Sequence, residues 1–205
     1  MTLVEQIKEL KKSSKKRNFI QRFDLIINLK DIDVKRPENR IDEIFVLPKG
    51  RGKPATITLF SDSLESLEDC KILKGKEIEE LPKNKKELKK LISWTTIFLA
   101  EPRLMPIVGK HLGKFLAPIG KMPKPVAGDV AKVIKSYKNA VKIQVKRQPV
   151  IHTVVGSENM KEEDVAENIK ALINFLITKL PKGKNNIGKV YLKLTMSPPV
   201  KLEVV

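Results

Sequence analysis

The chain has 205 residues, enough for one large domain or two small ones. Hydrophobic residues make up 41% of it, so it is able to bury a core, and a wholly disordered tail is excluded. Its 41 Lys and Arg against 24 Asp and Glu give a formal net charge of +17, which indicates a polyanionic partner. Nucleic acid is the first candidate for this partner, and an anionic membrane surface is the second. The Lys-rich surface of a thermophilic protein is a weaker explanation of the charge, because such surfaces usually carry a comparable number of Glu residues.

The first fifty residues predict a helix and two strands. Residues 2–12 place apolar side chains on one side of a helix, and "RFDLIINLK" alternates as a strand does. "DEIFVLP" predicts a second strand, and "KGRGK" predicts a turn or hinge. The lysines of "KKSSKKR" either complement the dipole of the preceding helix or belong to a basic surface.

The middle of the chain alternates predicted strands and helices. "ATITLF" and "TTIFLA" read as strands, and "KNKKELKKLIS" reads as a helix between them. A helix at "GDVAKVIKSYKNA" and an alternating strand at "AVKIQVK" follow. This order is typical of a parallel, doubly wound sheet.

Residues 109–126, "GKHLGKFLAPIGKMPKPV", predict a proline-stiffened loop rich in lysine. No Ser or Thr follows a Gly-Lys pair, and the prolines remove N–H donors that a nucleotide-binding loop needs. We therefore expect contact with many phosphates of a polyanion, or else a plain connector. The lysines expected to make this secondary contact are Lys110, Lys114, Lys121 and Lys124.

The last third predicts a long helix within residues 157–183, capped by Ser157, and then two strands. Alternation in "KVYLKLTM" directs Met196 toward the core with the leucines, and Lys189, Lys193 and Thr195 toward the other face. With "KKSSKKRNF", this face would form a basic platform carrying Phe19 as an apolar or stacking element. Core packing of Phe19 is the alternative.

These patterns predict a fold that is both α/β and α+β. Residues 1–49 with 147–205 are expected to form a discontinuous α+β domain from both termini. Residues 50–146 are expected to form an inserted, Rossmann-like α/β domain, with chain crossings near "KGRGK" and "VKRQP" acting as a hinge pair.

Catalytic and metal-binding patterns have little support. Cys70 is the single cysteine, which excludes an intramolecular disulfide framework and a Cys-based zinc site. His111 and His152 fall in different predicted domains. No apolar run is long enough for a signal peptide or a membrane span. We expect a cytoplasmic, non-enzymatic protein, monomeric when free, with no cofactor, no metal and no membrane partner.

Three separated motifs carry a resemblance. "VLPKGRGK", "IVGKHLGKFLAPIGKMPKPV" and "KLTMSPP", in this order, resemble the ribosomal L-one family of the large subunit's mobile side stalk, in its archaeal form. The resemblance covers essentially the whole chain and implies the same fold, with a Rossmann-like domain inserted into a discontinuous one. It implies binding to large-subunit rRNA near the tRNA exit site, help in releasing deacylated tRNA, repression of the protein's own mRNA, and a place on the cytoplasmic ribosome.

The resemblance also implies where RNA binds. The segment around Phe19, with Asn18, and the run Thr195, Met196 and Ser197 would form a buried, hydrogen-bonded patch in the complex. The cations expected around this patch are Lys15, Lys16, Arg17, Arg22 and Lys193.

The sequence departs from the family pattern at two places. The family usually has Gly where Ser197 stands. In the proline-rich segment Lys114, Ala117 and Ile119 replace the usual Pro, Gly and Arg. The rival interpretations are a Rossmann-type nucleotide-dependent enzyme and a general polyanion binder.

Overall fold

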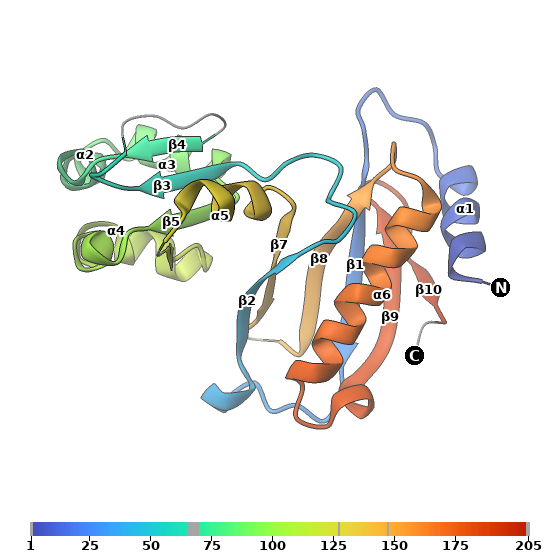
Figure 1. The fold of residues 1–205 in the computed structure, drawn as a ribbon. Coiled ribbons are helices and arrows are strands. Elements are labelled where there is room, and N and C mark those ends of the chain that lie inside the picture. Colours follow the sequence, from blue (N-terminus) through green and yellow to red (C-terminus); the bar gives the residue numbers. More distant parts are fainter. Residues whose placement is uncertain (1, 65–69, 127, 147, 204–205) are drawn as a thin grey trace. The chain divides into compact units, whose positions relative to one another are not determined.

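The structure is a computed structural model that describes residues 2–64, 70–126, 128–146 and 148–203 (Figure 1). The chain divides into two compact units. The discontinuous unit comprises Met1–Pro54 and Asn139–Val205, and the inserted unit comprises Ala55–Lys138. The two chain crossings thus lie at 54/55 and 138/139, whereas the sequence placed them after residue 49 and before residue 147.

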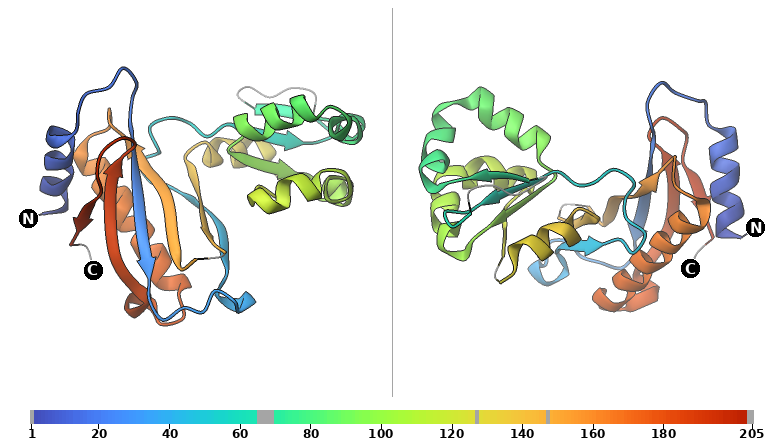
Figure 2. Two further views of the ribbon diagram at one scale, coloured as in Figure 1. Left: turned by 180° about the vertical axis from the view of Figure 1, so that it is seen from behind. Right: turned by 45° about the horizontal axis from the view of Figure 1, so that its top comes forward.

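The discontinuous unit is built on an antiparallel sheet of order β10-β9-β1-β8, with a separate antiparallel pair β2-β7. Its elements are α1 (Leu3–Ser13), β1 (Arg22–Leu29), β2 (Ile41–Val46), β7 (Ala140–Val145), β8 (Val150–Ser157), α6 (Glu162–Lys179), β9 (Ile187–Leu194) and β10 (Val200–Leu202), with 3₁₀ turns at Pro37–Asn39 and Gly183–Asn186. Helix α6 covers one face of the four-stranded sheet, and among the described residues no helix lies over the other face in the views of Figure 2.

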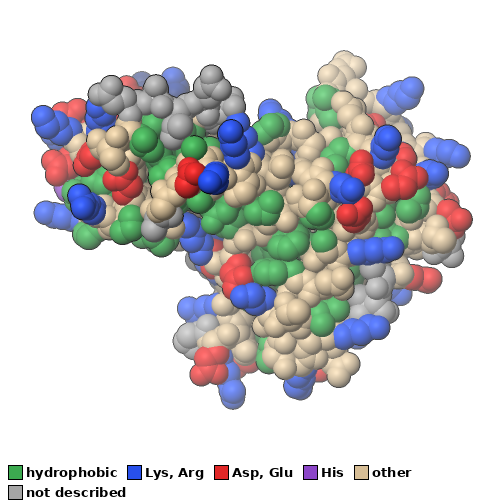
Figure 3. Space-filling view, viewed as in Figure 1, with side chains coloured by type: hydrophobic (Ala, Val, Ile, Leu, Met, Phe, Trp, Pro, Cys, Tyr) green, Lys and Arg blue, Asp and Glu red, His purple; other side chains and the backbone are tan. Residues whose placement is uncertain are grey.

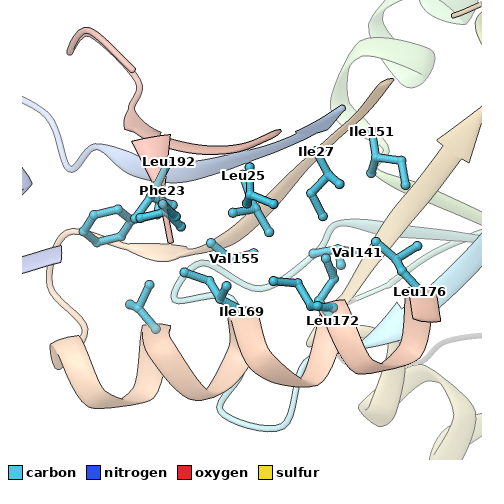
Figure 4. Close-up of a cluster of buried hydrophobic side chains, with 14 of the residues drawn as sticks. Phe23, Leu25, Ile27, Val141, Ile151, Val155, Ile169, Leu172, Leu176 and Leu192 are labelled. Atoms are coloured by element: carbon cyan, nitrogen blue, oxygen red, sulfur yellow. The ribbon is translucent and has the colours of Figure 1, made fainter. Parts of the chain in front are cut away.

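The core of this unit follows from strand alternation. Phe23, Leu25 and Ile27 on β1 point toward α6 and are fully buried, while the residues between them face outward (Figure 4). Helix α6 presents Ile169 and Leu172 to them. Helix α1 joins the same core, and the Lys11 ammonium ties it to α6 by hydrogen bonds to the Met160 carbonyl (2.7 Å) and the Glu162 carboxylate (2.8 Å).

Two sequence predictions about the discontinuous unit differ from the structure. Strand β7, placed in the inserted domain by the sequence, pairs with β2 from Val46↔Ala140 to Ile41↔Val145 and contributes Val141 to the core of the discontinuous unit. Helix α6 begins at Glu162 after the extended residue Lys161, so Ser157 does not cap it. Ser157 is instead the buried last residue of β8.

The inserted unit has a parallel sheet of order β4-β3-β5-β6. Its elements are β3 (Ile57–Phe60), β4 (Cys70–Leu73), α2 (Gly75–Glu80), α3 (Lys85–Trp94), β5 (Ile97–Ala100), α4 (Met105–Ile119), β6 (Lys124–Pro125) and α5 (Val130–Tyr137), with 3₁₀ turns at Leu81–Lys83 and Pro102–Leu104. Strands β3 and β5 are buried on both faces, as continuous apolar runs in parallel sheets are. The expected combination of α+β and α/β structure is confirmed.

The prediction of a loop at residues 109–126 was wrong, because most of this segment belongs to helix α4. Val108, Leu112 and Leu116 recur at four-residue spacing, are buried and pack under the helix. The prolines fall where a helix tolerates them: one lies in the first turn, and Pro118 lies in the last turn. Gly120, with φ of 73°, ends the helix in the left-handed conformation that glycine favours.

Candidate RNA-binding interface

The two segments named by the sequence for RNA binding lie side by side in the structure. β1 and β9 are neighbouring antiparallel strands, so the start of one meets the end of the other. The Arg22 backbone N–H donates to the Thr195 hydroxyl at 3.1 Å, and the Met196 N–H donates to the Gln21 side-chain oxygen at 3.2 Å. These bonds fix the segment before β1 against the turn after β9.

Gln21 is the centre of this arrangement, and the sequence analysis missed it. Its side chain is 1% exposed, and its amide nitrogen donates to the Lys15 carbonyl at 3.4 Å. Its backbone N–H donates to the Glu158 carboxylate (3.2 Å), and its carbonyl accepts from the Glu158 N–H (2.9 Å). Gln21 therefore links the basic segment, the end of β8 and the turn after β9. The alternation of β1, extended two residues upstream of Phe23, is the signal that would have found it.

Three exposed apolar side chains lie on the joined segments. Phe19 is 51% exposed, Ile20 60% and Met196 58%. Strand alternation predicted that Met196 lies in the core, and this prediction was wrong. Strand β9 ends at Leu194, and residues 195–197 form a turn. Apolar side chains that are exposed together, while the backbone beneath them is held by hydrogen bonds, are typical of a binding surface. We call Phe19, Ile20, Met196, Thr195 and Ser197 the apolar patch.

Most of the predicted cations surround the apolar patch. Lys15, Lys16, Arg17 and Asn18 are exposed in the segment that leads to Phe19, and Arg22 is exposed beside Thr195. Lys189 is also exposed, but it lies near the start of β9, six residues from Thr195 and about 20 Å along the strand. The structure therefore does not bring Lys189 to the patch.

Lys193 belongs to the uncovered face of the sheet, next to the patch. It lies opposite Asp24 in the β1–β9 ladder and helps to line an open hollow of about 390 Å³. The hollow is lined by Asp24, Ile26, His152, Thr153, Val154 and Lys193. Burial raises the pKa of the Asp24 carboxyl, against the opposing effect of the neighbouring Arg22, Lys193 and His152. Lys193 thus partly neutralises a carboxylate that would otherwise repel phosphate.

Ser197, where the resembled family usually has Gly, closes the turn after β9. The Leu194 N–H donates to the Ser197 hydroxyl at 2.8 Å, and that hydroxyl donates to the Pro198 carbonyl at 3.0 Å. The Ser197 N–H completes the turn with the Leu194 carbonyl at 3.0 Å. Ser197 does not have a positive φ, so its side chain is accommodated without backbone strain.

The four lysines predicted to make a secondary contact in the inserted unit have different surroundings. Lys110 and Lys114 are exposed on α4, one turn apart, and the Lys114 ammonium lies 5.5 Å from the Phe115 ring centroid. Lys121 is half-buried, and its ammonium donates to the Ile92 and Thr95 carbonyls at 2.6 Å each. It therefore supports the end of α3. Lys124 is half-buried on β6.

The carboxyl ends of β3 and β5 are where a Rossmann-like sheet binds nucleotides, because the strand order reverses there. In this chain the Glu101 carboxylate occupies that place and accepts hydrogen bonds from the Ser61 and Ser63 hydroxyls. These two bonds, that from Ser61 above all, lower the pKa of Glu101, so it is anionic near neutral pH. An anion at this position repels a nucleotide phosphate, which disfavours the interpretation as a nucleotide-dependent enzyme.

The described residues include neither a metal-binding cluster nor a membrane-spanning helix. Among them, no group of three or more His, Cys, Asp and Glu side chains is placed to hold a metal ion. Within the same part of the chain, no helix is long and apolar enough to cross a membrane.

Comparison with known proteins identifies the family of the chain. The family described as "Ribosomal protein L1p/L10e family" matches residues 10–198. The large ribosomal subunit protein uL1 of Methanothermobacter thermautotrophicus is 43% identical over 98% of both chains. The proteins of the same name from Thermococcus kodakarensis and Pyrococcus horikoshii are 40% and 41% identical over 98% of this chain and 96% and 95% of their own. The chain therefore belongs to the ribosomal protein L1 family, whose matched members are named as ribosomal proteins and not as enzymes.

Proposed function

We propose that this protein is a cytoplasmic component of the large ribosomal subunit and that it binds large-subunit rRNA through the apolar patch of the discontinuous unit. The observation that carries the proposal is that the segment with the exposed Phe19 and Ile20 is held against the turn with the exposed Met196. Two hydrogen bonds hold them: the Thr195 hydroxyl accepts from the Arg22 N–H, and the Gln21 side-chain oxygen accepts from the Met196 N–H. Lysines and arginines on the same segment attract phosphates, while the patch supplies an uncharged surface that is buried when RNA docks.

Charge and patch have separate roles in this proposal. The discontinuous unit has 25 Lys and Arg against 14 Asp and Glu, and Figure 3 shows Lys and Arg side chains spread over the visible face of the molecule. Such a distribution attracts any nucleic acid and provides little selection. Selection comes from the position of the patch, because only an RNA of matching shape covers it without leaving polar groups unpaired.

The test compares a ribosomal RNA fragment from the side stalk with a scrambled RNA of equal length over a series of salt concentrations. Thr195→Val keeps the shape of the side chain and removes the hydroxyl. It should weaken binding of the stalk fragment by about 1–3 kcal/mol and leave binding of the scrambled RNA unchanged. Lys15→Ala should weaken both RNAs and reduce the salt slope by about 0.7–0.9. Equal loss for both RNAs with Thr195→Val would show general polyanion binding instead.

Two finer roles follow from the family resemblance: assistance to deacylated tRNA leaving the exit site, and repression of the protein's own mRNA through the same patch. If the patch serves both RNAs, the stalk fragment and the leader of the protein's own mRNA must compete for it. Thr195→Val should lower the affinities for the stalk fragment and for the mRNA leader by the same factor. An mRNA leader that binds together with the stalk fragment would exclude a shared site.

A further inference from the structure

Helix α3 of the inserted unit carries an exposed aromatic side chain that the core does not use. Trp94, the single tryptophan of the chain, is the last residue of α3 and is 49% exposed. The buried face of α3 consists of Leu88 and Leu91 instead. Among the described residues, Phe19 is the only other aromatic side chain of comparable exposure, and it belongs to the apolar patch of the discontinuous unit.

The indole borders an open hollow of about 420 Å³ in the inserted unit. The hollow is lined by Lys71, Leu81, Glu87, Lys90, Leu91 and Trp94. Its volume lies within the range of small-ligand sites, roughly 300–1,000 Å³. Its walls combine one aromatic ring, two leucines, two ammonium groups and one carboxylate.

The backbone around Trp94 is held firmly although the side chain is exposed. The Trp94 carbonyl accepts a hydrogen bond from the Thr56 hydroxyl, and the neighbouring Ile92 and Thr95 carbonyls accept from the Lys121 ammonium. A ring on a fixed backbone loses little freedom when a flat ligand stacks on it.

The charges around the hollow favour a nucleotide. Lys71 and Lys90 are exposed, and neither forms an ion pair with the other residues that the structure describes. Further exposed lysines continue along the surface of α3: Lys85, Lys86 and Lys89. Proteins that bind single-stranded RNA combine an aromatic ring, on which a base stacks, with cations that contact the phosphates.

The carboxylate of Glu87 favours RNA over an acidic peptide as the ligand of the hollow. A carboxylate inside the hollow repels the carboxylates of a peptide, but it accepts hydrogen bonds from the amino group of a base such as cytosine. We propose that the hollow beside Trp94 is a second RNA-binding site, which takes one unpaired, amino-bearing base on the indole and its flanking phosphates on Lys71 and Lys90. This inference rests on the proposed RNA-binding function of the chain.

Trp94 itself reports on the site, because no other tryptophan contributes to the fluorescence. The full chain is titrated with single-stranded oligo(C), with oligo(U), and with an abasic ribose-phosphate strand of equal length. Oligo(C) should quench the tryptophan emission at lower concentration than oligo(U), and the abasic strand should leave it unquenched. Lys90→Ala should raise the half-quenching concentration of oligo(C) severalfold. Lys76→Ala, which removes an exposed lysine from α2 outside the hollow, should not.

A second measurement separates this site from the apolar patch. In a chain already carrying Phe19→Ala and Thr195→Val, Trp94→Leu should weaken oligo(C) binding, followed by the anisotropy of a labelled strand, by about fivefold or more. Unquenched emission in a chain that still binds the stalk fragment would overturn the inference and leave the proposed function intact. Quenching by poly-glutamate as strong as that by oligo(C) would overturn it in favour of an acidic peptide. Base-dependent quenching without any preference for stalk RNA would uphold the site and refute the apolar patch.

Discussion

The substitution Gln21→Leu tests whether one buried side chain organises the apolar patch. Leucine fills a similar volume but removes two side-chain hydrogen bonds, to the Lys15 carbonyl at 3.4 Å and from the Met196 N–H at 3.2 Å. Each such bond contributes about 0.5–1.5 kcal/mol, and both are long, so we expect a loss of about 1–2 kcal/mol in the free energy of unfolding. Urea unfolding followed by circular dichroism measures this loss.

RNA binding should change as well, because the segment before β1 and the turn after β9 would have to be ordered again on docking. If that ordering costs the same 1–2 kcal/mol, affinity for the stalk fragment falls by about 5- to 30-fold, and affinity for scrambled RNA stays constant. Gln6→Leu is the matched control. Gln6 is a buried glutamine of α1 whose side-chain oxygen has no hydrogen-bond partner among the described residues, so its loss should not destabilise the protein. A Gln21→Leu protein with unchanged stability and unchanged RNA preference would refute the reasoning.

Three further predictions concern the frame around the sites. The hydrogen bond from Lys11 lowers the pKa of Glu162 below its ordinary value of 4.5. The Lys11–Glu162 pair therefore stabilises the fold fully above pH 4.5, and this stabilisation is lost as the pH falls through the lower pKa of the folded state. Glu162→Gln should therefore cost about 0.5–1 kcal/mol in urea at neutral pH, and its difference from the parent should disappear in acid. Asn168→Leu should cost about 3–5 kcal/mol in the same assay, because this fully buried side chain pairs with three backbone groups of two segments. Lys121→Met should lower the thermal midpoint by loosening the end of α3 and should alter the emission of Trp94 without RNA; a midpoint and spectrum like those of the parent would contradict its supporting role.

The sequence pattern located the elements of the fold better than it located the boundary between the units. Strand β7 was recognised as a strand but assigned to the wrong unit. Its alternation, with Val141, Ile143 and Val145 inward and Lys142 outward, already indicated a strand with one solvent-facing side, as in an antiparallel sheet. The parallel strands β3 and β5 are buried throughout. Pairing with β2 depends on residues about a hundred positions away, which local pattern does not specify.

The sequence pointed to the two segments of the proposed site through their composition and motifs, but it missed the residues whose role depends on tertiary contacts. Lysine density and the family motif pointed to the neighbourhood of Phe19 and Thr195, and the structure places these together. Gln21 was missed because its importance lies in partners at positions 15, 158 and 196, which come together only in the folded sheet. The helix at α4 was missed because Pro and Gly were given more weight than the four-residue spacing of Val108, Leu112 and Leu116.

The two proposed RNA-binding sites, one at Phe19 and one at Trp94, differ in chemistry. Phe19 belongs to the apolar patch, whose backbone is fixed by hydrogen bonds, and such a surface would favour one shape of folded RNA. Trp94 borders an open hollow with lysines and Glu87, which would favour a flexible strand with an unpaired, amino-bearing base. Binding at the first surface should therefore persist at high salt, whereas binding at the second should weaken steeply.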